Sequence, residues 1–176
     1  DRVYLSAKGK LASNLSIKVQ TDVGRAKAQE VDIDGDGTGD AGVPEDEKLR
    51  LFIKNAYLQW GVTGDVQLRF GVAGTAFVGI YDKFWGQRYI SKSFTDDNKI
   101  LDSADIGVHA LGNHADGLVS WQAAVINGEG YGSAETDSAK AAQARVTIDP
   151  LASGDNSLPI TVFASQDFLS PDTDDA

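Results

Sequence analysis

The chain has 176 residues, a formal net charge of −10 and no cysteine. The negative charge disfavours nucleic acid as a partner, and the lack of cysteine excludes disulfide bonds and thiolate metal sites. No apolar run approaches the ~18 residues of a transmembrane helix. Many β-branched and aromatic residues, with 19 glycines against 4 prolines, favour an all-β protein.

Apolar and polar residues alternate in segment after segment, which is the period of a β-strand because successive side chains point to opposite faces. In the segment VQLRFGVAGTAF, Leu68 and Phe70 share one face while Gln67 and Arg69 share the other. The same pattern predicts eight strands, at about 2–11, 14–23, 49–62, 66–77, 103–112, 117–127, 140–149 and 158–168. The segment 134–144 is the one place where a short helix could fit.

The connections between these strands alternate strictly in length. Short turns rich in Gly, Asp, Asn and Ser alternate with long connections, which lie at about 24–48, 78–102, 128–139 and from 169 onwards. Greek-key links in a sandwich give no reason for this pattern, but an up-and-down transmembrane barrel has short turns on one side and long loops on the other. Residues 1–176 are therefore expected to form a single antiparallel β-barrel domain.

Both ends of the chain are expected on the side of the long loops, since the first strand leads into a short turn and the last into a long connection. Bacterial barrels normally place both termini in the periplasm. We therefore expect the eight strands to be part of a larger barrel, with at least one strand missing from each end. The chain also begins at Asp1 and contains no methionine, as expected of a processed or truncated chain.

In such a barrel the apolar faces contact lipid and the polar faces line the passage. The outward residues are expected to include Leu15, Ile17, Val19, Val66, Leu68, Phe70, Val72, Ile106, Val108, Val146 and Ile148. The candidate pore-lining residues are Lys8, Lys18, Gln67, Arg69, Asp105, His109 and Arg145. Their cations outnumber the one acid, and rings of Lys or Arg favour anions. We therefore predict a weak anion preference, with Arg69 as its main determinant.

The predicted strand 49–62 changes its pattern halfway. Its two halves carry outward apolar residues of opposite parity, namely Leu49, Leu51 and Ile53, then Ala56, Leu58 and Trp60. An unbroken strand would place Lys54 in lipid at a cost of roughly 2–4 kcal/mol near the midplane, so we predict a β-bulge near Lys54–Asn55. Trp60 and Trp121 both fall near short turns and fit an aromatic girdle, although ordinary core tryptophans are the alternative.

The long connection 78–102 combines aromatic and basic residues. So many aromatic side chains would be costly in a wholly solvated loop, so the connection is expected to pack against something. One interpretation is a loop folded into the barrel as a constriction, bordered by Lys83, Trp85, Arg88 and Lys92. The other is packing on the rim or against a neighbouring subunit. The sequence leaves both open.

The segment DIDGDGTGD resembles a calcium-binding loop in its spacing of acidic residues. The side chains that would coordinate Ca²⁺ are those of Asp32, Asp34, Asp36 and Asp40, with Gly37 at the sharp turn. Val43 stands where a bidentate carboxylate is expected, and no helices flank the segment. A solvated acidic loop is therefore the alternative to a structural calcium site.

The sequence offers no sign of catalysis. It contains no nucleophile motif, and its two histidines lack a cysteine or carboxylate at ligand spacing. The segment NGEGYG at 127–132 is expected to be a strand-end turn rather than a phosphate-binding loop, because no helix follows it. We therefore do not expect an enzyme, and no cofactor other than Ca²⁺ is implied.

Five segments together follow the pattern of one protein family. They are Ala56-Tyr57-Leu58, Gly71 to Thr75, Trp85 with Arg88, Ser103 to Val108, and Asn127 to Tyr131. Over roughly residues 49–132 the chain thus resembles Gram-negative outer-membrane porins, closest to the phosphate-selective porin O and P family. The resemblance implies a trimeric barrel of about sixteen or more strands in the bacterial outer membrane, which passes small solutes.

Two classes of function remain open. One is a porin, a passive diffusion channel for small hydrophilic solutes or anions. The other is a soluble or cell-surface all-β binding or scaffold protein with a calcium-stabilised loop, in which the apolar faces form a sandwich core. The alternation of the connections and the family resemblance favour the channel.

Overall fold

The computed structural model of the protein describes most of the chain. The described residues are 3–25, 29–31, 41–43, 49–87, 89–91, 93–98, 100–132, 139–152 and 157–168. The acidic segment 32–40, with its expected calcium ligands, lies outside them, as do Arg88 and Lys92.

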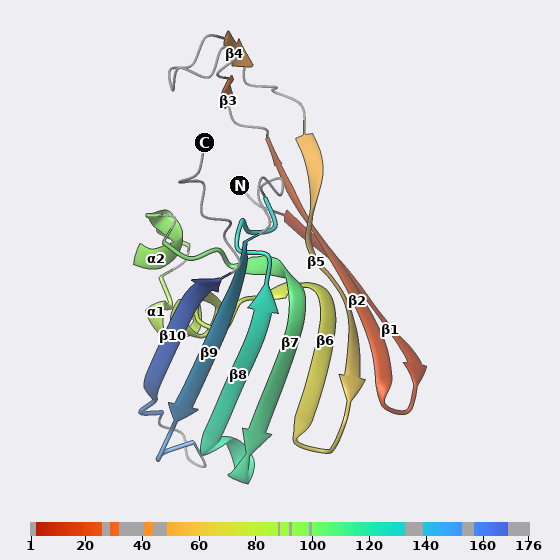
Figure 1. Ribbon diagram of the computed structural model, residues 1–176, viewed down its shortest axis with the longest axis vertical. Helices are drawn as coiled ribbons and strands as arrows, with labels where there is room; N and C mark the ends of the chain where they lie inside the picture. Colours follow the sequence, from red (N-terminus) through yellow and green to blue (C-terminus); the bar gives the residue numbers. More distant parts are fainter. Residues whose placement is uncertain are drawn as a thin grey trace.

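The protein is all-β, and its main element is one sheet of eight antiparallel strands (Figure 1). The strands are β1 (Val3–Ala12), β2 (Leu15–Arg25), β5 (Leu49–Gly61), β6 (Val66–Gly74), β7 (Ala104–His114), β8 (Val119–Ile126), β9 (Lys140–Ile148) and β10 (Ile160–Phe168). Each strand pairs with the next in chain order, so β1 and β10 form the two edges. The predicted strands and their up-and-down order are thereby confirmed.

Smaller elements occupy the connections. A two-stranded ribbon, β3 (Gln29–Val31) with β4 (Ala41–Val43), lies between β2 and β5. Helices α1 (Val78–Trp85) and α2 (Phe94–Asp97) lie between β6 and β7, where the sequence predicted no helix. A short turn of 3-10 helix, Ala115–Gly117, joins β7 to β8. In the described part of the chain, no helix is long and apolar enough to cross a membrane.

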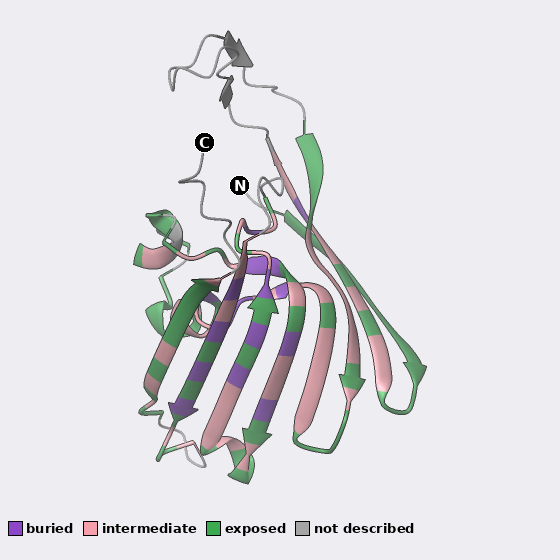
Figure 2. Ribbon diagram, in the orientation of Figure 1, coloured by how far each residue is buried: buried purple, intermediate pink, exposed green. Residues whose placement is uncertain are grey.

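On this sheet the polar face is the more buried and the apolar face the more exposed, which is the reverse of a sheet in a soluble protein. On β7, the polar His109 is 0% exposed while Val108 is 48% exposed. On β8, Gln122 is 7% exposed and Val125 is 48% exposed. Figure 2 shows the same alternation along β7, β8 and β9. We call the face of Val108 and Val125 the outer face and that of His109 and Gln122 the polar face.

The outer face carries the apolar residues that the alternation places there, and the described residues place no second sheet over it. Burying a large apolar face normally contributes much of the stability of a sheet in water. This sheet instead leaves that face open and covers part of its polar face, so its apolar residues do not form the core of a sandwich.

The predicted bulge in β5 is confirmed. Along β2, Gln20 lies opposite Asn55 and the next residue, Thr21, lies opposite Ile53, so Lys54 is the extra residue. Leu51 on one side of the bulge and Trp60 on the other are both exposed on the outer face. The extra residue thus shifts the alternation by one and brings both halves of the strand into agreement.

Candidate functional site

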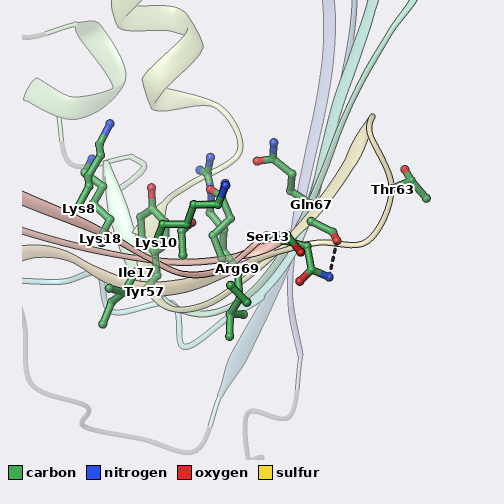
Figure 3. A pocket seen from close by; sticks show the side chains of 16 residues that line it. Lys8, Lys10, Ser13, Ile17, Lys18, Tyr57, Thr63, Gln67 and Arg69 are labelled. Carbon is green, nitrogen blue, oxygen red and sulfur yellow. Dashed lines mark hydrogen bonds between the residues drawn. The ribbon is translucent and has the colours of Figure 1, made fainter.

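A groove of about 730 Å³ lies on the polar face of β1, β2, β5 and β6. Four cationic side chains line it, those of Lys8, Lys10, Lys18 and Arg69. They project to the same side of the sheet, away from Ile17 (Figure 3). Among the described residues that border this groove none is acidic, so the charged side chains described there are all positive.

The strand register brings these cations together from distant parts of the chain. Lys8 lies directly opposite Lys18, and Lys18 lies opposite Tyr57 on β5. On the neighbouring row, Gln59 lies opposite Arg69 and accepts a hydrogen bond of 2.9 Å from its Nε. Because side chains alternate along each strand, all these residues share one face.

One aromatic ring, that of Tyr57, contacts two of the cations of the groove. The guanidinium carbon of Arg69 lies 5.0 Å from the centre of the Tyr57 ring, and Nζ of Lys18 lies 5.9 Å from it. Such contacts with the π-face attract cations and hold them in place. Tyr57 and Gln59 therefore orient Arg69, while most of its hydrogen-bond donors stay available for a solute.

The start of the connection between β6 and β7 crosses the polar face. The carbonyl of Gly74 accepts a hydrogen bond of 2.8 Å from Nε2 of Gln122, on β8. Two residues later, the amide of Ala76 donates to Oε1 of Gln143, on β9, at 3.2 Å. The ring of Phe77 then lies 5.0 Å from that of Phe163, on β10. The start of the connection, at residues 74–77, therefore packs against the polar face of the sheet.

This crossing divides the predicted pore-lining residues into two groups. Lys8, Lys18, Gln67 and Arg69 border the open groove. The other three, Asp105, His109 and Arg145, lie on the polar face as expected but are buried. In the sheet register, His109 lies in the same row as Ala124 and Gln143, and Gln143 is a residue that the connection contacts.

Two residues of the buried group, Asp105 and Arg145, make hydrogen bonds within the protein. The carboxylate of Asp105 accepts hydrogen bonds from the amides of Ile106 at 2.6 Å and Gly128 at 2.7 Å. Nη1 of Arg145 donates to Oγ1 of Thr147 at 2.8 Å. Asp105 thus fixes the turn after β8, which is the strand-end turn expected for 127–132.

On α1, the side chains of Lys83, Phe84 and Trp85 are exposed and that of Tyr81 is half-buried. Lys83 borders a second pocket of about 400 Å³, which Asp116 and Asp149 also line. Nε1 of Trp85 donates to the carbonyl of Ser91 at 3.4 Å. Arg88 and Lys92 lie outside the described residues, so Lys83 is the one of the three expected cations whose position is described.

The roles of Tyr57 and Gln59 in the groove and the contacts of Lys54 were not predicted from the sequence. A signal for the first two was present, because Ala56 and Leu58 face outward and their neighbours must then face inward. The partners of Lys54 are 49 and 77 residues away in the chain, so no local pattern could predict them. Within the described residues, no group of three or more His, Cys, Asp or Glu side chains is placed to bind a metal ion.

Comparison with known proteins found no matching family model, no matching curated protein and no matching solved structure. The fold and site by themselves define an all-β protein with one open, up-and-down antiparallel sheet of eight strands. Its polar face carries a cationic groove next to a connection that folds across the sheet.

Proposed function

We propose that this chain is part of an outer-membrane porin, a passive diffusion channel for small hydrophilic solutes. In this proposal the eight strands cross the bilayer within a larger closed barrel. The outer face contacts lipid, and the polar face lines a water-filled passage. The short turns lie on the periplasmic side, and the trimeric assembly follows from the family resemblance.

The observation that carries the proposal is the reversed burial of the two faces. Water disfavours a continuous apolar surface, and monomeric soluble proteins rarely expose more than a few hundred Å² of it. Val108 and Val125, which lie opposite each other on β7 and β8, are each 48% exposed near the middle of the sheet. Exposing this apolar face to lipid chains carries no free-energy penalty, and water in a polar lumen hydrates the polar face.

The hydrogen bonding of the backbone also supports a lipid environment for the sheet. In the hydrocarbon region every amide and carbonyl must find a partner within the protein, and continuous antiparallel ladders provide this. Trp60 and Trp121 add a second argument, because both lie at the short-turn end and on the outer face. Tryptophan is enriched at this depth, where an apolar ring with one polar atom meets the lipid headgroups.

The groove supports a weak preference for anions. Its four cations face no acidic residue among the described groove-lining residues. Charges in a narrow passage are screened less than those in outer loops, where the Debye length is about 8 Å at physiological salt. The cations of the groove therefore influence a passing solute more than the acidic residues of the long connections do.

The test is the reversal potential of the intact protein, with the complete barrel to which this chain belongs, in a planar bilayer under a salt gradient. We expect the unaltered protein to prefer anions and Arg69→Glu to shift the potential toward cations. Lys140→Glu is the matched control, since it changes the same charge at a position that does not border the groove. We expect this control to produce a smaller shift.

Two results would contradict the proposal. A cation preference in the unaltered protein, or equal shifts in Arg69→Glu and Lys140→Glu, would remove the role of the groove. A protein that stays dispersed without detergent and forms no channels would remove the porin assignment itself. It would leave the soluble or cell-surface binding protein as the interpretation.

A further inference from the structure

The bulge in β5 lies just beyond the point where the pairing between β5 and β6 ends. The last registered pair between β5 and β6 is Ala56 with Val72, and β6 ends at Gly74. From there the chain turns onto the polar face, while β5 continues to Leu49 along β2. Lys54 is the extra residue of β5 at this level, so its side chain lies beside the point where the connection begins.

The amine of Lys54 reaches past the end of β6 to two other segments. Its Nζ donates a hydrogen bond of 2.8 Å to Oγ of Ser103, the residue before β7. It lies 3.4 Å from the hydroxyl of Tyr131, after β8, and 4.5 Å from the centre of the same ring. One side chain therefore joins β5 to the segments that precede β7 and follow β8.

These segments are the ones that hold the two ends of the connection 75–103 together. The amide of Thr75 donates to the carbonyl of Ser103 at 3.3 Å, and Oγ1 of Thr75 donates to the carbonyl of Asp102 at 2.5 Å. The amide of Tyr131 donates to the carbonyl of Ala104 at 3.0 Å. We call the place where the two ends of the connection 75–103 meet the root of the connection. The contacts of Lys54 thus end on this root.

The close approach at Gly130 shows how tightly this root is packed. A Cβ added to Gly130 would lie 2.3 Å from Cγ of Asp102, and the φ angle of Gly130 is +80°. Only glycine fits such a position without a shift of its neighbours. The segment after β8 therefore lies directly against the end of the connection, and it carries Tyr131 to the amine of Lys54.

We propose that Lys54 is a positioning residue, which fixes the root of the connection 75–103 and thereby its place on the polar face. A bulge interrupts the ladder, and taking an amine partly out of water is costly unless other contacts compensate for it. An apolar residue in a regular strand would therefore be the simpler solution. An amine offers three donors, and here it engages a hydroxyl, a phenol and a π-face together.

The functional part of this inference rests on the proposed channel. If the polar face lines a passage, the connection limits its width, and the contacts of Lys54 keep that width constant. Loosening the root would then broaden the range of positions of α1 and produce fluctuating conductance. The structural part, the position of the connection, does not depend on the channel.

The test measures the distance between spin labels on the reconstituted protein. The chain has no cysteine, so Gly79→Cys on α1 and Gly64→Cys in the turn before β6 accept labels uniquely. At both positions an added Cβ meets nothing within 4 Å. We expect one narrow distance distribution with Lys54 present, and the loss of that narrow distribution in Lys54→Met.

Three variants keep the test specific. Lys140→Met removes a lysine at the start of β9, whose Nζ donates to the carbonyl of Ala139, and should leave the distribution narrow. Lys54→Arg retains a donor and a cation, and should restore much of the narrow distribution. Ser103→Ala removes one acceptor only and should broaden the distribution in the same direction as Lys54→Met.

An unchanged distribution in Lys54→Met overturns the inference. If Lys54→Met loses its sheet by circular dichroism, Ser103→Ala decides in its place, and an unchanged distribution there has the same meaning. Conductance recordings separate the two proposals. A broadened distribution with steady current would leave Lys54 as a positioning residue and contradict the view that the connection limits a passage.

Discussion

Lys8 and Lys18 lie directly opposite each other on β1 and β2, and both side chains are on the polar face. Like charges at opposed positions of an antiparallel pair repel and destabilise the pairing. Lys10 and Arg69 line the same groove and are also positively charged, so they add to this repulsion. An anion bound in the groove would reduce the repulsion between the lysines. The arrangement is therefore better explained by anion binding than by the stability of the sheet.

Lys8→Glu should therefore stabilise the sheet while it weakens the preference for anions. An opposite-charge pair across two strands contributes roughly 0.2–1 kcal/mol, and the substitution also removes the repulsion. Chemical unfolding in detergent micelles measures the first effect, and the reversal potential measures the second. Lys8→Gln is the control, with an intermediate value expected for both. A Lys8→Glu protein less stable than Lys8→Gln would show that the pair is not repulsive.

Val125→Arg should destabilise the protein in lipid vesicles by roughly 2–4 kcal/mol, the cost of a cation on a lipid-facing strand near the midplane. Val125 is 48% exposed, and Leu151, in the turn after β9, is 45% exposed. Leu151→Arg is therefore a control matched in exposure but not in depth. A substitution at an exposed site in water usually changes stability by less than about 0.5 kcal/mol. Equal, small effects of both substitutions would mean that the outer face meets water.

The strands and the bulge could be predicted because both follow from the local alternation of apolar and polar residues. The order of the strands could be predicted because short turns alternate with long connections. A strand has a period of two, so Val66, Leu68 and Phe70 reveal their common face without knowledge of any partner. The same logic located the bulge, since the outward residues on either side of Lys54 have opposite parity. One inserted residue is the simplest way to place both sets on one face.

The helix α1 and the course of the connection could not be predicted in the same way. Phe77, Ile80, Tyr81 and Phe84 have helical spacing, but α1 has 8 residues and offers only about two turns of this pattern. The contact between Ala76 and Gln143 joins residues 67 apart in the chain. Parity showed that His109 is on the polar face, but nothing local indicated that the residue is buried.

Gly112→Ala should displace the Trp121 ring on the outer face. A Cβ at position 112 would lie 2.1 Å from Nε1 of Trp121, and this nitrogen donates a 3.1 Å hydrogen bond to Nε2 of His114. Overpacking of this kind costs roughly 1–3 kcal/mol. The emission of Trp121, measured with Trp60→Phe and Trp85→Phe in the background, should shift when the ring leaves His114.

Gly64→Ala is the control for this substitution, because a Cβ there meets nothing within 4 Å. The emission of Trp121 should be the same in Gly64→Ala as in the background protein. The same emission in Gly112→Ala would show that the ring does not depend on the missing side chain of Gly112. The hydrogen bond to His114 would then not hold the ring in place.

The turn between β9 and β10 should loosen in acid, because the carboxylate of Asp149 holds it. This group accepts hydrogen bonds from the hydroxyl of Ser157, from the amide of Leu158 at 2.9 Å and from the amide of Leu151 at 3.1 Å. The bond from Ser157, followed by that from Leu158, lowers the pKa of Asp149 below its ordinary value of 3.8, and Lys83 adds a weaker attraction.

A carboxyl group whose pKa is lower in the folded protein binds fewer protons there than in the unfolded chain. Its stabilising contribution is therefore complete above pH 3.8 and is lost as the pH falls below that value through the folded pKa. The amides of Leu151 and Leu158 should lose protection against hydrogen exchange over this range, relative to Val146 in β9. Asp149→Asn should show lower protection at neutral pH and no such transition. Protection factors that stay constant in the unaltered protein on acidification would show that the carboxylate does not hold the turn.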